Sequence, residues 1–419
     1  MGEFVVRGGR RLNGTVRING AKNAALPIMA AAILADEPLV VTGVPDLRDV
    51  RVMQRVLEAL GVRVERWGTT LRLDPRPLQG YAVPAELMQE MRASVFVMGP
   101  LLARLGVATI VQPGGCAIGD RPIDLHLKGF AALGAEVREV DGATLVRAHG
   151  RLRGGEIHLS YPSVGATENL MMAAALAQGE TRIRNAAMEP EIVDLAQCLE
   201  QMGCPVRGAG TREIRIIGQD RLGGGEHPVI PDRIETATFA LAVAAAGGTL
   251  RLEHCLPAHL PGFWTKLEEV GVEVEEVDAE TVVVRAPDHY PATGTAVATH
   301  PYPGFATDIQ PQWMAFVTRV PGLHIITERV FENRLGHAQE LRRMGAHILV
   351  DQRTAVVRGG TPLHGAAVRA IDLRAGAALV IAALGAEGET RISGREVIER
   401  GYERLDQRLG QVGADIAAE

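Results

Sequence analysis

A pattern of hydrophobic and polar positions recurs six times along this 419-residue chain. Each copy has the apolar end of a helix, then a glycine, then alternating apolar and polar residues. Such an alternation is typical of a strand with one buried face, and a glycine before it is typical of a helix end. The copies lie roughly 70 residues apart, which predicts six small α/β modules rather than a solenoid. They are centred on Gly61, Gly134, Gly203, Gly271, Gly345 and Gly413.

Each module also contains a cluster of polar residues followed by an alanine-rich, apolar stretch. The stretch is apolar on most sides, so we expect a helix that is buried rather than laid on the surface. Ser, Thr, Asp or Asn at its start would be ordinary caps. Lys or Arg there opposes the helix dipole, and a bound anion would offset that repulsion. The clusters begin at Lys22, Arg92, Ser163, Arg233, Thr307 and Arg374.

A Gly- and Pro-rich segment, residues 218–231, separates the third module from the fourth and predicts a crossing between two domains. We therefore expect an N-terminal domain over residues 21–229. Residues 5–18 have the pattern of a strand pair, and we assign them to the second half, whose sixth module otherwise ends abruptly. The second domain is then residues 1–20 plus 230–419, and the fold class is α/β.

The composition is that of an ordinary globular protein, with 47% hydrophobic and 22% charged residues. A net charge of −6 argues against a nucleic-acid partner, and the longest apolar stretch, residues 24–35, is too short for membrane insertion. The first residues lack the apolar core of a signal peptide, so we expect a cytoplasmic protein. The four cysteines form no C-x-x-C pair and the histidines do not cluster, so no metal is expected. Dinucleotide and P-loop fingerprints are missing as well.

Cys116 differs from the other three cysteines, Cys198, Cys204 and Cys255, which read as small buried hydrophobic residues. Glycines and a proline surround Cys116, so its segment is predicted to be a flexible loop. A thiol on such a loop is typical of a lid that brings a reactive group to a site. Arg121 favours the thiolate and a bound anion favours the thiol, so a nucleophile and a proton donor are both open.

Further cations, Arg334, Arg374 and Arg400, lie in predicted loops of the second half. A single loop arginine is usually a solvated surface residue. Several of them, together with Lys22, at equivalent ends of repeated modules predict a cationic cleft between the two domains. Such a cleft suits a small polyanion with phosphate and carboxylate groups. Asp308 lies among these cations and is either an ordinary N-cap or a carboxylate that accepts a substrate proton.

The chain resembles the UDP-N-acetylglucosamine 1-carboxyvinyltransferase family of enolpyruvyl transferases over its whole length. The resemblance rests on ordered motifs: N-G-A-K-N-A-A-L-P, M-R-A-S, P-G-G-C-A-I-G-D-R-P-I-D-L-H, S-V-G-A-T-E-N, P-D-R-I-E-T, T-D-I-Q, V-F-E-N-R, D-L-R-A and R-G-Y-E-R. It implies an inside-out α/β barrel of two domains, each with three βαβαββ repeats around buried helices, and an active-site cleft between them. It also implies transfer of enolpyruvate from phosphoenolpyruvate to the 3′-hydroxyl of UDP-N-acetylglucosamine, with release of phosphate and without a metal or organic cofactor.

The resemblance also implies roles for individual residues. Cys116 matches the lid thiol that protonates C3 of phosphoenolpyruvate and can hold a covalent adduct, and Asp308 matches the base that takes the sugar hydroxyl proton. The residues that match phosphoenolpyruvate contacts are Lys22, Arg121 and Arg400 for phosphate, Arg334 and Arg374 for carboxylate, and Asn23. The residues that match UDP-sugar contacts are Asn23, Arg92, Arg121, Pro122, Ile123, Asp124, Leu125, Ser163, Val164, Gly165, Glu189, Asp308 and Val330.

Two positions distinguish this chain within the resemblance. Tyr161 stands where some members of the family carry a lysine, so the nucleotide contact there is left open. Cys116 is retained rather than replaced by aspartate, which predicts inactivation by fosfomycin, a thiol-alkylating epoxide.

Two alternatives are weighed against this reading. The nearest is the shikimate-pathway sibling; Lys22-Asn23 and the P-G-G-C segment favour the UDP-sugar family. A non-enzymatic DNA clamp is disfavoured because its cations should line solvent-facing helices. We expect a monomer or a weak homo-oligomer.

Overall fold

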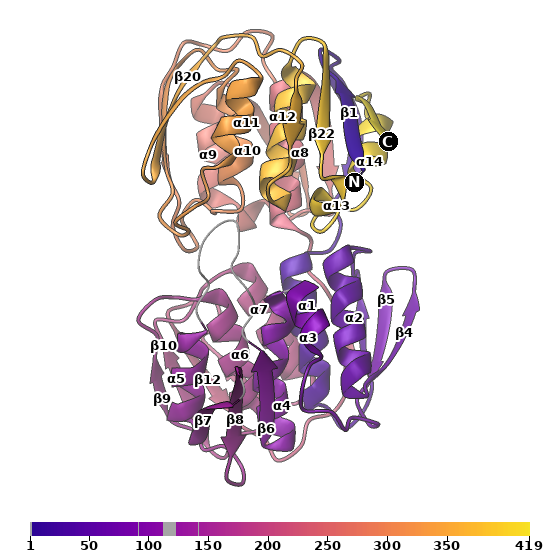
Figure 1. The fold of residues 1–419 in the computed structure, drawn as a ribbon, viewed down its shortest axis with the longest axis vertical. Coiled ribbons are helices and arrows are strands. Elements are labelled where there is room, and N and C mark those ends of the chain that lie inside the picture. The colour runs from indigo at the N-terminus through magenta and orange to yellow at the C-terminus, as the bar shows by residue number, and fades with distance from the viewer. Residues whose placement is uncertain (1, 91, 112–122, 141) are drawn as a thin grey trace. The chain divides into compact units, whose positions relative to one another are not determined.

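The computed structural model describes residues 2–90, 92–111, 123–140 and 142–419 of the chain. These residues form two compact units (Figure 1). The N-terminal unit contains the described residues between Gly20 and Ile230, and the C-terminal unit contains residues 2–19 and 231–419. Each unit has a hydrophobic core of its own. The two-domain α/β class expected from the sequence is thereby confirmed.

Three apolar helices, two of them alanine-rich, form the centre of the N-terminal unit, and most of their residues are buried as the apolar pattern predicts. Small residues let them approach closely: a Cβ at Gly99 would lie 2.2 Å from the carbonyl oxygen of Asn169, so only glycine allows this contact. The central helices are α1 (Lys22–Ala31), α4 (Met98–Leu105) and α6 (Val164–Ala175). The other helices of this unit are η1 (Ala32–Leu34), α2 (Arg48–Leu60), α3 (Ala85–Glu90), η2 (Arg92–Val97), α5 (Asp124–Ala132) and α7 (Pro190–Gln201).

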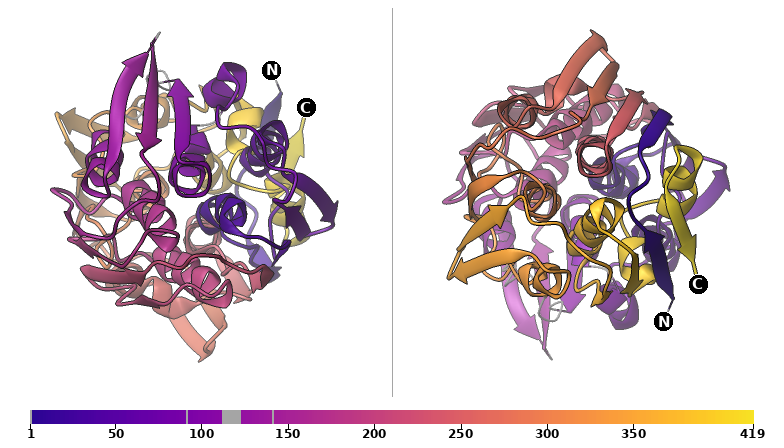
Figure 2. Two further views of the ribbon diagram at one scale, coloured as in Figure 1. Left: turned by 90° about the horizontal axis from the view of Figure 1, so that it is seen from below. Right: turned by 90° about the horizontal axis from the view of Figure 1, so that it is seen from above.

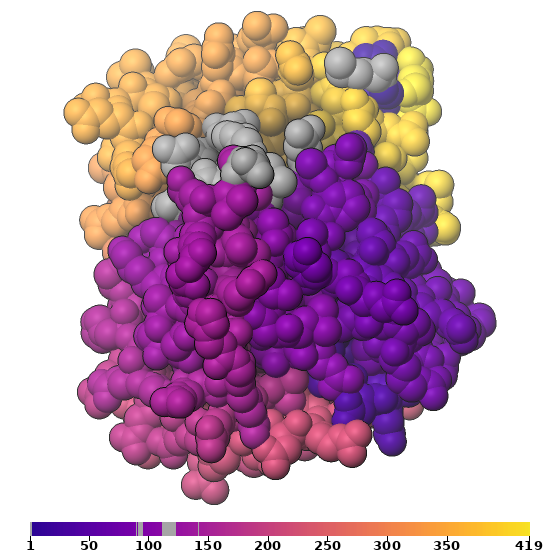
Figure 3. All heavy atoms as spheres, turned by 60° about the horizontal axis from the view of Figure 1, so that its bottom comes forward, coloured from indigo at the N-terminus to yellow at the C-terminus, as the bar shows by residue number. Residues whose placement is uncertain are grey.

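The described strands of the N-terminal unit form three sheets. The first contains, in order, β13 (Gly225–Pro228), β3 (Leu39–Thr42), β5 (Thr70–Asp74) and β4 (Arg63–Trp67). The second contains β6 (Val107–Val111), β8 (Ala143–Ala148) and β7 (Ala135–Val140). The third contains β9 (Glu156–His158), β10 (Glu180–Arg184), β12 (Glu213–Ile217) and β11 (Val206–Arg207). In the space-filling view, the purple and magenta parts of the chain form a continuous layer of side chains on one face of this unit (Figure 3).

Three helices that contact one another form the centre of the C-terminal unit: α8 (Arg233–Ala246), α10 (Gln310–Val317) and α12 (Leu373–Gly385). Seen end-on, these helices lie inside and the strands lie around them (Figure 2). The remaining helices are η3 (Pro257–His259), α9 (Pro261–Glu269), α11 (His337–Arg343), α13 (Arg395–Ile398) and α14 (Leu405–Gln411). None of the described helices in either unit is long and apolar enough to cross a membrane.

The three sheets of the C-terminal unit have the same plan as the first and third sheets of the N-terminal unit, whereas the three described strands of the second N-terminal sheet are all antiparallel. In the shared plan, an edge strand runs parallel to its neighbour, and the next two strands are antiparallel. The first sheet contains β2 (Leu12–Arg17), β14 (Gly248–Glu253), β16 (Thr281–Arg285) and β15 (Glu273–Asp278). The second contains β17 (Thr295–Ala298), β18 (Gly322–Thr327), β20 (Thr354–Gly359) and β19 (His347–Asp351). The third contains β21 (Ala367–Arg369), β22 (Glu389–Ser393), β1 (Glu3–Arg7) and β23 (Asp415–Ala418).

All six repeat glycines adopt the left-handed conformation that ends a helix. Their φ angles lie between 91° and 106°, a region that side chains with a Cβ rarely adopt. Each glycine follows a helix and precedes a strand, so the six-module prediction is confirmed. The sheets are separate groups of three or four strands, and the described residues do not form a closed barrel.

Two expectations about connecting segments are corrected. Residues 5–18 do not form a strand pair: β1 lies between β22 and β23, whereas β2 pairs in parallel with β14 in another sheet. The 218–231 segment is not simply a linker, because β13 within it pairs with β3. Local alternation identifies strands, but it does not identify partners that are hundreds of residues away.

Candidate functional site

In the C-terminal unit, Asp308 lies between two buried arginines. Its Oδ1 is 2.8 Å from Nη1 of Arg334, and its Oδ2 is 3.1 Å from Nη2 and 3.3 Å from Nε of Arg374. The arginine side chains are only 3% and 2% exposed, whereas that of Asp308 is 26% exposed. Asp308 precedes α10 without capping it, since Ile309 is the N-cap and makes no side-chain cap. The N-cap alternative for Asp308 is therefore wrong.

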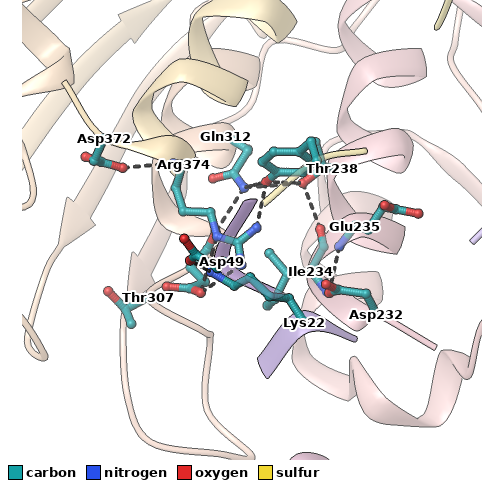
Figure 4. Close-up of polar contacts among 12 residues, drawn as sticks. Lys22, Asp49, Asp232, Ile234, Glu235, Thr238, Thr307, Gln312, Asp372 and Arg374 are labelled. Carbon is teal, nitrogen blue, oxygen red and sulfur yellow. Dashed lines mark hydrogen bonds and ion pairs between the residues drawn. The ribbon is translucent and has the colours of Figure 1, made fainter. Parts of the chain in front are cut away.

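Arg374 is the second residue of α12 and is held from both sides. Its Nη1 donates to Oη of Tyr402 at 3.0 Å, on the side away from its Asp308 contacts, and Gln312 donates to the same phenol (Figure 4). Burial disfavours the charged guanidinium, yet the pKa of Arg374 is raised because Tyr402 and Asp308 face it. Asp372 caps α12 by accepting from the backbone N–H groups of Arg374 and Ala375. The charge of Arg374 at the start of α12 is therefore balanced by a carboxylate of the protein itself, that of Asp308.

Arg334 is positioned through Thr307 and the fully buried Glu328. Nη1 of Arg334 donates to Oγ1 of Thr307 at 2.9 Å, and this hydroxyl donates to Oε2 of Glu328 at 2.9 Å. Oε1 of Glu328 accepts from the backbone N–H of Val330 at 2.8 Å and of Phe331 at 3.1 Å. A single carboxylate thus holds the loop that contains Val330 and orients the hydroxyl that contacts Arg334.

Arg400 lies in the turn that follows α13 and is half-buried. The two residues after it reach the Arg374 group: Tyr402 contacts Arg374 directly, and a Cβ at Gly401 would lie 3.6 Å from Nη1 of Arg374 and 2.5 Å from Cδ1 of Leu373. The R-G-Y segment therefore passes close to the start of α12, where a side chain on residue 401 would require Leu373 to move.

In the N-terminal unit, Lys22 is the first residue of α1 and forms a buried ion pair (Figure 4). Its Nζ is 3.1 Å from Oδ2 of Asp49, in the first turn of α2, and the two side chains are 9% and 5% exposed. Asn23, the next residue of α1, is half-buried. As at Arg374, an aspartate balances a cation at a helix start.

Helices α5 and α6 meet at His126, in the first turn of α5, and Asn169, in the middle of α6. Oδ1 of Asn169 accepts from the backbone N–H of Gly99 at 2.8 Å, which fixes the amide orientation. Nδ2 of Asn169 therefore donates to Nδ1 of His126 at 3.1 Å, and the neutral imidazole carries its hydrogen on Nε2. Burial lowers the pKa of His126 to about 4, in agreement with a neutral ring. A Cβ at Gly165 would lie 3.6 Å from this ring, so the two predicted UDP-sugar segments lie side by side.

The remaining predicted residues of the N-terminal unit also lie at helix starts. Ser163 caps α6 by accepting from the backbone N–H of Ala166, and Val164 and Gly165 follow it. Ile123 is the N-cap residue of α5, whose first residues are Asp124 and Leu125. Glu189 is the buried N-cap residue of α7. Tyr161 is 41% exposed just before α6.

Part of the predicted site lies outside the described residues. Cys116, Arg121 and Pro122 belong to this part of the chain, and Arg92 begins η2 with a side chain that is not described. Cys198, Cys204 and Cys255 are buried as expected. Within the residues that the structure describes, no group of three or more His, Cys, Asp or Glu is arranged to hold a metal ion.

Several residues that contact the predicted site residues in either unit were not identified as candidates from the sequence. Thr238 and Gln312 lie in apolar stretches that were expected to be buried helices, and Glu328 follows a strand, but none of the three belongs to a motif of the family resemblance. Asp49 resembles an ordinary first-turn acid. His126 and Tyr402 lie in motifs that carry the family resemblance, and their place in those motifs could have identified them as candidate site residues.

Comparisons with known proteins agree on one family. The family described as EPSP synthase (3-phosphoshikimate 1-carboxyvinyltransferase) matches residues 6–409. UDP-N-acetylglucosamine 1-carboxyvinyltransferase 1 of Symbiobacterium thermophilum is 52% identical, covering 99% of this chain and 94% of that protein. UDP-N-acetylglucosamine 1-carboxyvinyltransferase of Gloeobacter violaceus is also 52% identical, covering 98% of this chain and 89% of that protein.

Solved structures share the architecture. The enolpyruvyl transferase NikO from Streptomyces tendae has a TM-score of 0.90 at 27% identity, covering 100% of this chain and 98% of that one. EPSP synthase from Acinetobacter baumannii has a TM-score of 0.77 at 16% identity, with 100% of both chains covered. At 16% identity, the likeness to EPSP synthase shows a shared fold alone.

Proposed function

The chain belongs to the EPSP synthase family of carboxyvinyltransferases, and on this basis we propose that it transfers the enolpyruvyl group of phosphoenolpyruvate to UDP-N-acetylglucosamine. One observation carries the choice of acceptor: the chain is 52% identical, over 99% of its length, to a relative named for the UDP-sugar reaction. The reaction releases phosphate and belongs to peptidoglycan synthesis.

The chemistry proposed here is an addition followed by an elimination. C3 of phosphoenolpyruvate takes a proton while the 3′-hydroxyl oxygen of the sugar bonds to C2, and the hydroxyl proton passes to a base. The resulting tetrahedral intermediate then loses phosphate from C2 and a proton from C3, which restores the double bond. The protein contributes by orienting the two substrates, supplying the acid and the base, and stabilising the anionic groups.

In the C-terminal unit, we assign the substrate carboxylate to Arg334 and Arg374 and the base to Asp308. Arginine suits this role because its planar fork matches a carboxylate. Asp308 is more exposed than either arginine and lies beside both guanidinium groups, so it can meet a hydroxyl that approaches from solvent. Val330, on the loop held by Glu328, is assigned to the sugar nucleotide.

The other roles follow the family resemblance. Lys22, Arg121 and Arg400 are assigned to phosphate, with Asn23 beside them, and Cys116 is assigned as the proton donor to C3. For the UDP-sugar we assign Glu189, the basic residues Arg92 and Arg121, and the two segments that meet at His126. These segments are Pro122, Ile123, Asp124 and Leu125, and Ser163, Val164 and Gly165.

The proposal extends to the domains, the location and the assembly state. We take residues 21–229 and residues 1–20 plus 230–419 as the two functional domains. Both proposed substrates are cytoplasmic metabolites, so the enzyme is placed in the cytoplasm, as a monomer or a weak homo-oligomer.

A second acceptor deserves a direct comparison because the matching family is described by the 3-phosphoshikimate reaction. The test is phosphate release from phosphoenolpyruvate with either UDP-N-acetylglucosamine or shikimate 3-phosphate as the acceptor. We expect release with the UDP-sugar alone, and a sugar nucleotide product whose mass has increased by one enolpyruvyl group. Release with shikimate 3-phosphate alone would contradict the proposed acceptor.

A further inference from the structure

One hydroxyl group connects the three central helices of the C-terminal unit. Oη of Tyr402 lies 3.0 Å from Oγ1 of Thr238 on α8, 3.0 Å from Nε2 of Gln312 on α10 and 3.0 Å from Nη1 of Arg374 on α12. Figure 4 shows Thr238, Gln312 and Arg374 directed towards one another from these helices. All four side chains are buried, so water does not replace these contacts.

The direction of each hydrogen bond follows from the chemistry of the donors. The N–H groups of Arg374 and Gln312 can only donate, so Oη of Tyr402 accepts from both. The hydroxyl hydrogen of Tyr402 must then point to Oγ1 of Thr238. The hydroxyl of Thr238 in turn donates to the carbonyl oxygen of Ile234 at 2.7 Å. The orientation of the phenol is therefore fully determined by its neighbours.

The same group also holds the backbone beside the proposed base. Nε2 of Gln312 donates to the carbonyl oxygen of Asp308 at 2.9 Å as well as to Tyr402. The guanidinium of Arg374 lies 5.3 Å from the centre of the Tyr402 ring, so the ring supports it in addition to the hydroxyl. Burial raises the pKa of Tyr402, against the effect of Arg374, which keeps the phenol neutral.

The opposite edge of Arg374, Nε and Nη2, contacts the carboxylate of Asp308. The proposed function needs this edge to bind the carboxylate of phosphoenolpyruvate. The substrate carboxylate therefore has to replace the carboxylate of Asp308. During that exchange, a buried guanidinium held only by Asp308 would lose its orientation. The contact through Nη1 is not involved in the exchange and persists.

We propose that Tyr402 is a positioning residue, which holds Arg374 by Nη1 so that its opposite edge stays in place when the substrate carboxylate replaces Asp308. This inference rests on the proposed function and adds to it a residue that does not touch the substrate. Thr238 and Gln312 share the task, because they fix the phenol that accepts from Arg374.

The test compares Tyr402→Phe with Tyr290→Phe. Tyr290 is a matched control because its hydroxyl also donates within the C-terminal unit, to the carbonyl oxygen of Ala244, but it does not contact Arg374. Steady-state kinetics should show a KM for phosphoenolpyruvate about tenfold higher in Tyr402→Phe, as expected for one lost hydrogen bond to a charged group. The KM for UDP-N-acetylglucosamine should change less than twofold. Tyr290→Phe should leave both KM values unchanged, even if both variants melt at lower temperature.

A double-mutant cycle distinguishes positioning from a general structural role. In an Arg374→Lys background, Tyr402→Phe should alter the KM for phosphoenolpyruvate less than twofold, because lysine has a single ammonium and no separate Nη1 to donate to the phenol while it faces a carboxylate. Thr238→Ser should retain the wild-type KM and Thr238→Val should raise it, since only serine can accept from Tyr402. An unchanged KM in Tyr402→Phe, equal rises in both KM values, or a full effect in the Arg374→Lys background would each overturn the inference. A wild-type protein that neither binds nor consumes phosphoenolpyruvate would overturn the proposed function, and this inference with it.

Discussion

Asp308 and Arg374 form an ion pair in which Nε and Nη2 of the arginine both contact one carboxylate oxygen, at 3.3 and 3.1 Å. In this state the proposed base occupies the edge of the guanidinium that the proposed function gives to the substrate. Substrate binding and release of the base are then linked, because the arriving carboxylate weakens the hold of Arg374 and Arg334 on Asp308. Asp308 can then accept the hydroxyl proton when phosphoenolpyruvate is already bound.

Asp308→Ala should lower kcat by about 10³-fold, the usual contribution of a general base. Binding of phosphoenolpyruvate should stay equal or become tighter, since a competing carboxylate has been removed. The rate of phosphate release measures kcat. Calorimetry measures the affinity for phosphoenolpyruvate, in a Cys116→Ala background that prevents a covalent adduct. Asp288→Ala, at an exposed ion pair with Arg11, is the control and should leave both unchanged. Weaker binding in Asp308→Ala would show that Asp308 supports the arginines instead of competing for them.

Asp49→Asn should destabilise the protein by roughly 3 kcal/mol, because it leaves the charge of Lys22 buried beside a neutral amide. Asp46→Asn is the matched control: its ion pair with Arg51 is exposed and should contribute less than about 1 kcal/mol. Urea denaturation of the three proteins measures the difference. Equal stability of the two variants would mean that Lys22 is satisfied without Asp49.

Glu168→Gln should stabilise the protein increasingly as the pH rises. Glu168 is fully buried on α6, and neither of its carboxyl oxygens has a hydrogen-bond partner among the residues that the structure describes. Burial, with Glu191 and Glu189 nearby, raises its pKa well above the usual value. A raised pKa means that stability is complete below the unfolded pKa, near 4.5, and is lost as the pH rises towards the folded value.

Glutamine does not titrate, so the gain of the variant should grow by up to about 1.4 kcal/mol per pH unit above that point. Denaturation midpoints between pH 4 and pH 8 measure it, with Glu58→Gln on the exposed face of α2 as the control. A pH-independent difference between wild type and Glu168→Gln would contradict a neutral buried carboxyl group.

Fosfomycin should abolish activity when it is added with UDP-N-acetylglucosamine, through alkylation of Cys116. Cys116→Ala should be inactive, whereas Cys116→Asp should retain transfer and resist the epoxide, because a carboxylic acid also donates a proton. Mass spectrometry of the treated protein locates the adduct. Full activity after saturating treatment would remove Cys116 from the proposed mechanism, and equal loss in both variants would indicate a role for sulfur beyond proton delivery.

The local parts of the fold were predictable, and the long-range parts were not. The left-handed conformation of a glycine such as Gly61 can be predicted, because the glycine follows an apolar helix end and precedes an alternating strand. The alanine-rich stretches predicted buried helices for a similar local reason. The partners of β1 and β2 were missed because strand pairing across the whole chain has no signature in a local window.

The same distinction applies to the candidate site. Cations at helix starts were recognised because Lys22 and Arg374 conflict with the helix dipole, and the structure gives each an aspartate partner. The sequence could not show that the partners are Asp49 and Asp308. It also could not show that Tyr402 meets Thr238, because that contact joins residues 164 positions apart.

The position of β1 has a consequence for how the protein is made. This strand is synthesised long before either of its neighbours, β22 and β23, with which it pairs on both edges. The N-terminal unit is complete in sequence by Ile230 and can fold during translation, whereas Phe4 and Val6 are covered only after β22 and β23 have been made. Loss or late folding of β22 and β23 would thus leave β1 as an unpaired apolar strand of the C-terminal unit.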